Sequence, residues 1–537
     1  MRVCLLYEDT DRSNREKYYD TASIAKDLGL KSVFSAASKK LIYDRNGELQ
    51  KTSDPDQYLA ETLKAVMMTP LYTKEEIDFR QEMIRDCLAH EDLTRSLYEV
   101  SKSMLRRWSE LGRVPAETFQ QGNPQAKLLN DIIILELFMN SLSEVKSLLE
   151  AVDDFTAKGF ITLKKEFHES YSEEREQYVK TVLEDISFYT EGVKTEEGPK
   201  KVNKPRIVLE CGLEDGLKFS SMKLEEVSSA KSKYYKPGST MALFKDMAQA
   251  RTPDSFSAVN DLRIAEQTKT LEYTIVCYLA DELKGFMEEF NTFFDRLKYQ
   301  MAFYLAAVQL IHQFERFKLD WCFPEVCAKD ELAFEELKEC VMGMGIRTEV
   351  VGNTCSFEKK DLLIVTGANQ GGKSTFLRSI GIAQVMMQCG LPVCAKSFSS
   401  GLFPKIFVHF TRREDSEMNS GRLDEELGRM SKIVEEIDDN SLILLNESFA
   451  TTTEKEGSVI AYDIIKALSE AGVRILTVTH LLSFARRMYE DSVESKDTSI
   501  EFLSAERKED GTRTFRMIRH EPELTSFGLD LYDEIVG

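Results

Sequence analysis

The sequence lacks the features of a secreted or membrane-spanning chain. No apolar run approaches the ~18 residues that a membrane-spanning helix needs. The opening residues, MRVCLLYEDTDRSNREK, place acidic residues directly after a short apolar run and carry no basic n-region of a signal peptide. The ten cysteines lie singly along the chain, so we expect reduced, mostly buried thiols rather than a disulfide scaffold. These absences predict a cytoplasmic protein.

Positive charge is also in short supply. The 537 residues include 91 acidic and 70 basic side chains, and the net charge of -21 opposes loose association with a polyanion. Residues 194–240 are the exception, with ten Lys and Arg against seven Asp and Glu. This tract can be interpreted as a solvated hairpin between two helices or as a small basic tip that contacts phosphates. Any nucleic-acid contact must therefore be local.

Proline is absent between Pro253 and Pro324, and this gap predicts long helices. Apolar residues recur there at steps of three and four from Ile275 to Ile311, which predicts one helix or two abutting helices. About forty residues of helix extend ~60 Å at ~1.5 Å per residue. A second stripe with the same spacing runs from Leu128 to Leu149. We interpret both as structural helices whose length suits them as levers.

The pattern changes after Trp321. Short aliphatic runs alternate with helical stretches, which indicates an α/β domain. The runs are LLIV (362–365), KIFVHF (405–410), LILL (442–445) and RILTVTH (474–480). At this length two or more domains are expected. We predict an N-terminal segment at 1–60, a helical domain at 61–320 with a basic, hairpin-like insert near 194–240, and an α/β domain at 321–537.

A phosphate-binding loop is predicted after the first of these strands. The segment IVTGANQGGKSTFLRS places Gly367, Gly372, Lys373 and Ser374 in the GxxxxGK[ST] spacing, after a strand and before a helix. Glycines let backbone N–H groups wrap phosphates, Lys373 reaches the β and γ oxygens, and the Ser374 hydroxyl ligates Mg²⁺. The sequence therefore predicts a nucleotide site.

Three further segments carry chemistry suited to such a site. Glu447 follows the buried strand at 442–445, where a carboxylate can polarise water as a general base. His480 ends the run VTH and is placed to bind a γ-phosphate, although an ordinary histidine fits the same pattern. Ser420 and Gly421, in NSGRLDEELGRM, lie in a loop that heads a helix, a position that favours anions.

Taken together, these segments resemble the MutS family, the ABC-type ATPases of DNA mismatch repair and recombination. The segment TGANQGGKSTFLRSIGIAQVMMQCGLPVCA resembles the family's phosphate loop and following helix. FTRREDSEMNSGR resembles its signature segment, and NESFATTTEKEG resembles its Walker B strand and D-loop. VTH at 478–480 and HEPELTSFGLDL near the C-terminus match further elements. The resemblance is close over residues 350–537 and rests on the long helices and CFPEV upstream.

The resemblance implies the fold, the cofactors and the site residues. The expected fold is α plus α/β, a long helical lever domain followed by an ABC-type P-loop ATPase domain. The expected assembly is a homodimer with ATP and Mg²⁺ held between the Walker loops of one subunit and the signature segment of the other. The implied nucleotide-binding residues are Gly367, Asn369, Gly371, Gly372, Lys373, Ser374, Thr375, Ser420 and Gly421. By the same resemblance Glu447 and His480 are catalytic, and Ser374 and Asn446 hold the metal.

Two residues depart from the family pattern inside this site. Asn446 stands where the family has an aspartate that holds Mg²⁺ through water. Asparagine keeps a carbonyl acceptor but removes the charge, so we expect either a slow ATPase that needs more Mg²⁺ or a protein that only binds ATP, and we favour the slow ATPase. Val350 stands where an aromatic ring usually stacks on adenine, so adenine recognition is left open.

The family's mismatch-reading domain has no counterpart that we recognise. Two tripeptides, Phe167-His168-Glu169 and Phe286-Met287-Glu288, fit the Phe-x-Glu wedge of that domain, but both lie in helical sequence and are interpreted as chance matches. We also expect no nuclease-like extension after Gly537.

Two functions fit these observations. The first is an ATP-driven dimeric clamp on mismatched, distorted or branched DNA, in DNA repair or recombination, with a contact tract of Lys200, Lys201, Lys204 and Arg206. The second is an ATP-switched interaction protein that remodels a ribonucleoprotein or protein partner without recognising DNA. The family resemblance and the basic tract favour the first. The acidic net charge and the missing mismatch-reading domain favour the second.

Overall fold

The computed structural model describes residues 2–8, 15–43, 49–111, 124–171, 177, 206–214, 218–228, 258–345, 350–411, 421–508 and 512–522. The chain divides into two compact units. The first comprises Met1–Val3, Ser96–Asp154 and Thr162–Lys298, and the second comprises Cys4–Arg95, Phe155–Ile161 and Tyr299–Gly537. The domain boundaries predicted from the sequence stay predictions.

The first unit is built from helices. They are α5 (Glu91–Leu111), α7 (Pro124–Glu150), α8 (Lys158–Ser170) and α11 (Ala258–Arg316), of which α5, α8 and α11 also contribute residues to the second unit. The predicted long helix is confirmed as one element of 59 residues. Aromatic rings pack in the core of the first unit. For example, the fully buried Phe138 stacks on Phe294 with ring centroids 5.9 Å apart. The two Phe-x-Glu tripeptides lie within α8 and α11, as predicted.

A hairpin interrupts these helices in the sequence. Strands β3 (Arg206–Glu214) and β4 (Lys218–Ser228) pair antiparallel, with Arg206 opposite Ser228. Residues 206–212 of the strand-like segment PRIVLECG therefore lie in β3. Lys200, Lys201 and Lys204 lie outside the described residues, so the basic contact tract stays a prediction.

The second unit is organised around a mostly parallel sheet. The strand order is β10-β11-β12-β8-β13-β14, in which the first five run parallel and β14 is antiparallel to β13. The strands are β8 (Leu362–Thr366), β10 (Lys405–Phe410), β11 (Ser441–Asn446), β12 (Arg474–Val478), β13 (Ile500–Arg507) and β14 (Arg513–Arg519). The four aliphatic runs thus form strands, which confirms the predicted α/β architecture.

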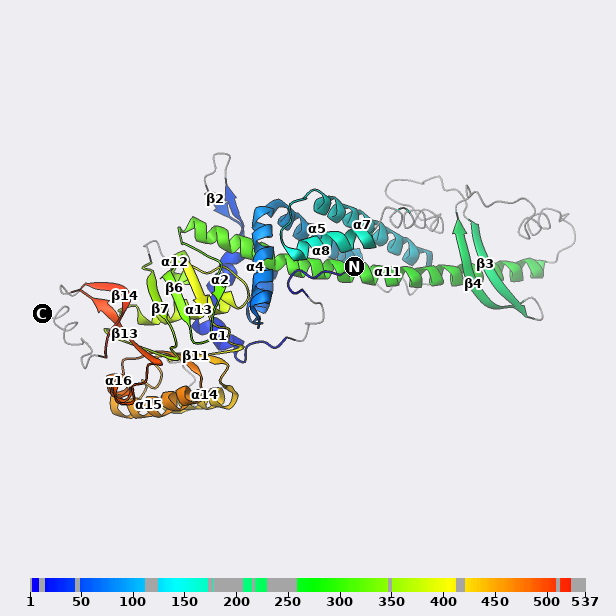
Figure 1. Ribbon diagram of the computed structural model, residues 1–537. Coiled ribbons are helices and arrows are strands. Elements are labelled where there is room, and N and C mark those ends of the chain that lie inside the picture. Colours follow the sequence, from blue (N-terminus) through cyan, green and yellow to red (C-terminus); the bar gives the residue numbers. More distant parts are fainter. Residues whose placement is uncertain are drawn as a thin grey trace. The chain divides into compact units, whose positions relative to one another are not determined.

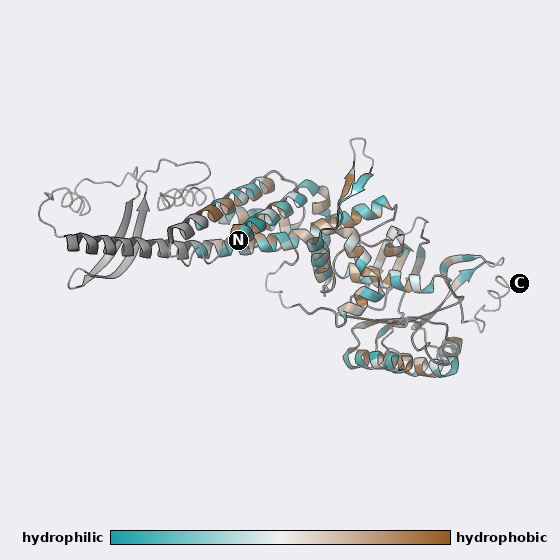
Figure 2. Ribbon diagram, turned by 180° about the vertical axis from the view of Figure 1, so that it is seen from behind, coloured by the Kyte–Doolittle hydropathy of each residue, from teal (hydrophilic) through white to brown (hydrophobic). Residues whose placement is uncertain are grey.

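Helices cover both faces of this sheet. They are α13 (Lys373–Met387), α14 (Arg422–Glu436), α15 (Glu454–Glu470) and α16 (Leu482–Ser495), the last three lying together on one face (Figure 1). Along β11, Ile443 and Leu445 join the core beneath α14–α16, whereas Leu444 contacts α13 on the other face. Successive side chains of a strand point to opposite faces of the sheet. Because helices cover both faces here, every side chain from Leu442 to Leu445 is buried, and the run is aliphatic throughout. The outer helices carry both hydrophobic and hydrophilic residues (Figure 2).

A smaller sheet is formed by three strands that precede β8 in the sequence and by one strand that follows α13. Its order is β5-β9-β6-β7, formed by β5 (Glu325–Val326), β9 (Ser397–Ser400), β6 (Leu332–Leu337) and β7 (Asn353–Phe357), and the short helix α12 (Cys340–Gly345) follows β6. The ring of Phe334 stacks on Phe398 across β6 and β9, with centroids 6.3 Å apart. This mixture of a small, largely antiparallel sheet and a larger parallel one is consistent with an ABC-type domain.

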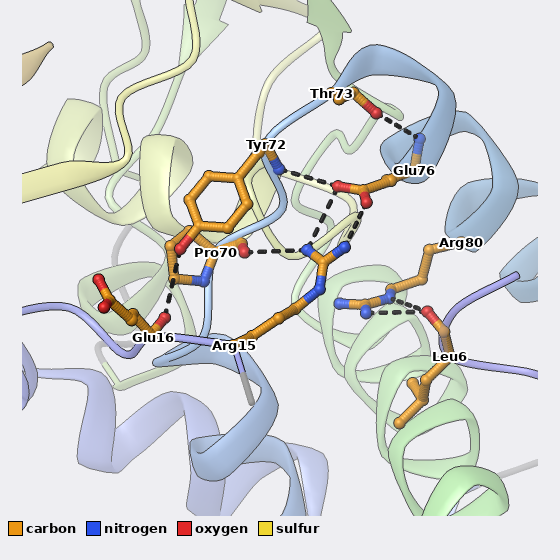
Figure 3. Close-up of polar contacts among 8 residues, drawn as sticks. All are labelled: Leu6, Arg15, Glu16, Pro70, Tyr72, Thr73, Glu76 and Arg80. Carbon is orange, nitrogen blue, oxygen red and sulfur yellow. Dashed lines mark hydrogen bonds and ion pairs between the residues drawn. The ribbon is translucent and has the colours of Figure 1, made fainter. Parts of the chain in front are cut away.

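The N-terminal residues of the second unit are fastened by arginines. The elements here are α1 (Thr21–Asp27), α2 (Leu30–Ala37), β1 (Leu41–Tyr43), β2 (Leu49–Thr52), α3 (Gln57–Met67) and α4 (Lys74–Ala89). Arg15 faces the Glu76 carboxylate and the Pro70 carbonyl, and the fully buried Arg80 donates to the carbonyl of Leu6 at 3.0 and 3.3 Å (Figure 3). Segments distant in sequence are therefore joined through α4.

The cysteines whose side chains are described form no disulfide bond. No helix among the described residues is long and apolar enough to cross a membrane.

Candidate functional site

Strand register brings the predicted site residues to one edge of the parallel sheet. Asn446 lies opposite Val478 on β12, which lies opposite Val365 on β8. The next residue of β11's chain, Glu447, donates its N–H to the Val478 carbonyl at 2.8 Å. Because parallel strands end at the same edge, Glu447, His480 and the loop after β8 leave the sheet side by side.

The phosphate loop, residues 367–372, has room for little but glycine at its key positions. Gly367 has φ +108°, and a Cβ there would lie 2.9 Å from the backbone nitrogen of Ala505. A Cβ at Gly371 would lie 2.8 Å from the Ala505 Cβ, and Gly372 caps α13 with φ +90°. The loop therefore needs glycine at these positions, because other residues would be strained or would clash there. It also lies at the N-terminus of α13, where backbone N–H groups are free to bind phosphate.

Lys373 directly follows this loop as the first residue of α13. Its side chain is buried, and its Nζ donates to the carbonyl oxygens of Gly367 at 2.9 Å and Ala368 at 3.0 Å. Burial lowers the pKa of Lys373, and the nearby Glu447 carboxylate acts in the opposite direction. Ser374 and Thr375 follow in the first turn of α13 and are half-buried, whereas Asn369 is exposed.

Glu447 and His480 are paired directly. One Glu447 oxygen, Oε2, accepts from the backbone N–H of His480 at 3.0 Å and lies 2.6 Å from its Nδ1. The hydrogen bond to Glu447 raises the pKa of His480, against the opposing effects of partial burial and of Lys373. Glu447 also has φ +56°, in the left-handed region. The two residues predicted to be catalytic therefore form one unit.

Asn446 ends β11 with an unsatisfied acceptor. Its Oδ1 is buried and makes no hydrogen bond in the described part of the chain, while its backbone carbonyl accepts from Thr411 N–H at 3.1 Å. A buried amide oxygen without a partner suits a water of hydrated Mg²⁺, which usually keeps several waters in protein sites. The residues at this strand end therefore fit the metal that the sequence predicts.

The structure describes the two ends of the signature segment (410–422), namely Phe410 and Thr411 at its start and the backbone from Gly421 at its close. Gly421 is exposed and caps the N-terminus of α14, whereas Ser420 lies outside the described residues. Its action on a second subunit stays a prediction. Val350 lies before β7 and is only 8% exposed, so it offers no open surface for a base.

Two residues of β14 contact the phosphate loop, and no sequence motif predicted either contact. Phe515 is 46% exposed, has φ +59°, and its ring lies 3.4 Å from where a Cβ at Gly372 would be. Arg513 donates to the Gln370 side chain at 3.0 Å. Both are separated from the loop by more than a hundred residues, and a short-range pattern cannot reveal such contacts.

Comparison with known families decides the affiliation. Residues 363–535 match the model of MutS domain V, and residues 72–317 match the model of the MutS2 N-terminal domain. The chain belongs to the MutS family. The second match extends the assignment to the helices, where the sequence offered the weaker resemblance.

The curated relatives of this MutS-family chain align over short segments. An "Endonuclease MutS2" from Streptococcus sanguinis is 33% identical over 119 residues, which cover 22% of this chain and 15% of the relative. A "MutS protein homolog 4" from Mus musculus is 35% identical over 133 residues, covering 25% of this chain and 14% of the relative. The alignments thus span well under a quarter of either relative.

Proposed function

We propose that this MutS-family chain binds ATP and hydrolyses it slowly, and that it acts as an ATP-driven dimeric clamp on distorted or branched DNA in repair or recombination. The observation that supports the ATPase most strongly is the convergence of Lys373, Glu447 and His480 at the edge where the phosphate loop leaves β8. Membership of the MutS family supports the link to DNA.

The geometry supports a distinct task for each residue. Lys373 exchanges the carbonyls of Gly367 and Ala368 for the β and γ oxygens of ATP, while the N–H groups at the start of α13 hold the phosphates. Glu447 orients the attacking water, and His480 turns from Glu447 to the γ-phosphate. Ser374 and Asn446 hold Mg²⁺, which neutralises phosphate charge when bound. Because Asn446 carries no charge, metal affinity is lower and turnover is slow.

Adenine recognition is assigned to Phe515. Its half-exposed ring lies next to Gly372 of the phosphate loop, whereas Val350 is buried. An exposed ring beside bound phosphates can stack on the base and contribute about 1–3 kcal/mol, as aromatic rings do for bases in single-stranded nucleic acids.

Dimerisation completes the site in this proposal. Ser420 and Gly421 of one subunit contact the ATP held by Lys373 of the other, so a subunit alone is inactive. A mixture of Lys373→Ala and Ser420→Arg subunits should regain activity through one intact composite site per heterodimer. Each variant alone serves as the control. If heterodimers form but no activity returns, the assignment of Ser420 to the opposite subunit is wrong.

DNA binding is assigned to the basic tract of Lys200, Lys201, Lys204 and Arg206, the last of which begins β3. Changing Lys200, Lys201, Lys204 and Arg206 to glutamate should abolish binding to branched duplexes, because each basic residue that meets a phosphate releases counterions. Binding by the unchanged protein should weaken steeply with salt. Without a wedge residue, homoduplex and single-mismatch DNA should bind almost equally, and a strong mismatch preference would contradict the interpretation.

A second candidate is an ATP-switched protein that remodels a ribonucleoprotein or protein partner. The observation that favours it is the net charge of -21. Co-purification with a Glu447→Gln variant, which holds ATP without hydrolysing it, distinguishes the two. Recovery of DNA supports the clamp, and recovery of ribonucleoprotein with salt-insensitive or absent DNA binding supports the alternative.

A further inference from the structure

A buried carboxylate outside the predicted site holds the loop that follows Glu447. Glu426 lies on α14 and is only 3% exposed. Its Oε1 accepts the N–H of Phe449 at 2.7 Å, and its Oε2 accepts the hydroxyl of Thr451 at 2.6 Å. A buried carboxylate is costly unless its oxygens are satisfied, so these two contacts tie α14 firmly to residues 448–451.

The other contacts of this loop make it a fixed structure. The Ser448 hydroxyl donates to the backbone carbonyl of His409 at 2.9 Å and lies 2.7 Å from the His409 Nδ1. The His409 ring stacks on Phe449, and its Nε2 lies 3.2 Å from the backbone carbonyl of Glu426. A Cβ at Gly457 would lie 2.4 Å from the Phe449 carbonyl, so α15 also packs closely on the loop. The loop is therefore held by β10, α14 and α15 together.

The backbone at Glu447 needs this support. Glu447 has φ +56° and Phe449 has φ +66°, so two residues with side chains occupy the left-handed region within three positions. Such conformations cost about 1–3 kcal/mol each and persist only where the surroundings over-determine them. The hydrogen bonds of Glu426 to Phe449 and Thr451, two and four residues after Glu447, help to hold the backbone in this conformation.

We propose that Glu426 is a positioning residue that couples α14 to Glu447. The inference rests on the proposed ATPase function and deepens it. Helix α14 begins at Arg422, directly after Gly421, so Glu426 lies a little over one turn from the end that would meet the other subunit's nucleotide. A shift of α14 on dimerisation is passed through Glu426 to the loop and then to Glu447. The site thereby becomes competent only when the interface has formed.

Substitutions at both ends of the contact test this role. Glu426→Ala removes both acceptors and should lower kcat by about tenfold or more, while KM and the affinity for a fluorescent ATP analogue change by less than about twofold. Glu426→Gln can accept from Phe449 N–H and donate to the Thr451 hydroxyl, so it should stay within about threefold of native kcat. Thr451→Val removes one contact and should give an intermediate loss. Glu435→Ala, at an exposed position on α14, is the matched control.

The readouts separate the possible failures. Native protein without ATP turnover would refute the proposed function itself. Native turnover with unchanged kcat in Glu426→Ala and Thr451→Val would overturn the role of Glu426. So would a parallel loss of kcat and nucleotide affinity in both variants, or a kcat in Glu426→Gln as low as in Glu426→Ala. If Glu426→Ala does not fold, the Thr451→Val and Glu426→Gln pair still decides, because the role requires a kcat loss in the first that exceeds the loss in the second.

Discussion

One carboxylate oxygen of Glu447 accepts a hydrogen bond from the backbone N–H of His480 at 3.0 Å and lies 2.6 Å from the Nδ1 of the same residue. The residue proposed to orient water and the residue proposed to contact the γ-phosphate therefore bind each other. In the proposed mechanism His480 must leave this contact when it turns to a phosphate. Nucleotide binding would then release the Glu447 carboxylate to orient water.

The pair makes the stability contributed by His480 depend on pH. Glu447 raises the pKa of His480 above its ordinary value of 6.5, so the paired imidazolium stabilises the fold fully below that value. The contribution is lost as pH rises through the raised pKa. We expect His480→Gln to lower the midpoint of thermal unfolding more at pH 6 than at pH 9. His168→Gln, at an exposed position of α8, is the control. An equal effect at both pH values would contradict the ion pair.

Asn446 should set the Mg²⁺ requirement. In the proposed site its unsatisfied Oδ1 would hold a metal-bound water without adding charge, whereas an aspartate would add a full negative charge near the metal. We expect Asn446→Asp to shift the Mg²⁺ midpoint of ATP turnover to lower concentration. Asn440→Asp, on an exposed turn before β11, is the control and should leave the midpoint in place. An unshifted midpoint in Asn446→Asp would mean that Asn446 merely ends the strand.

Phe515 should contribute to nucleotide affinity. Phe515→Ala would remove the proposed stacking on the base, for which we expect roughly a tenfold or greater loss of ATP affinity. Inorganic triphosphate carries no base, so its binding should be nearly unchanged. Ile518→Ala, also exposed on β14, should leave both affinities near native. Equal losses for ATP and triphosphate would assign Phe515 to the loop's structure and not to the base.

Arg80 should matter for the stability of the second unit. Besides Leu6, its guanidinium donates to the Cys389 carbonyl at 3.1 Å, beyond the end of α13. Arg80→Met fills similar space but leaves these carbonyls unpaired, so we expect the free energy of unfolding to fall by about 1–3 kcal/mol in chemical denaturation. Arg85→Met, exposed on the same helix, should cost less than about 1 kcal/mol. Equal effects would show that the buried contacts of Arg80 contribute nothing special.

Local patterns predicted the elements that depend on neighbouring residues. The aliphatic runs became β8, β10, β11 and β12, and the proline-free stripe from Ile275 to Ile311 lies within α11. The glycine spacing of the phosphate loop likewise predicted its place between β8 and α13. In each case the signal lies within one element or turn.

Contacts between distant residues were not predicted. Phe515 meets Gly372, and Glu426 meets Phe449, only because the sheet order places their segments together. The strands of the small sheet were also missed, because β5 has two residues and β9 is the polar run SFSS, which carries no clear alternation. The sequence could place Glu447 and His480 at strand ends, but their hydrogen bond required the register of β11 on β12.

The ATP turnover of the native protein and of Glu447→Gln, measured under saturating Mg²⁺ together with the binding of a fluorescent ATP analogue, tests the central claim most directly. We predict slow but measurable turnover for the native protein, and no turnover with retained nucleotide binding for Glu447→Gln. Undiminished turnover in Glu447→Gln, or native protein that binds ATP without hydrolysing it, would contradict the account.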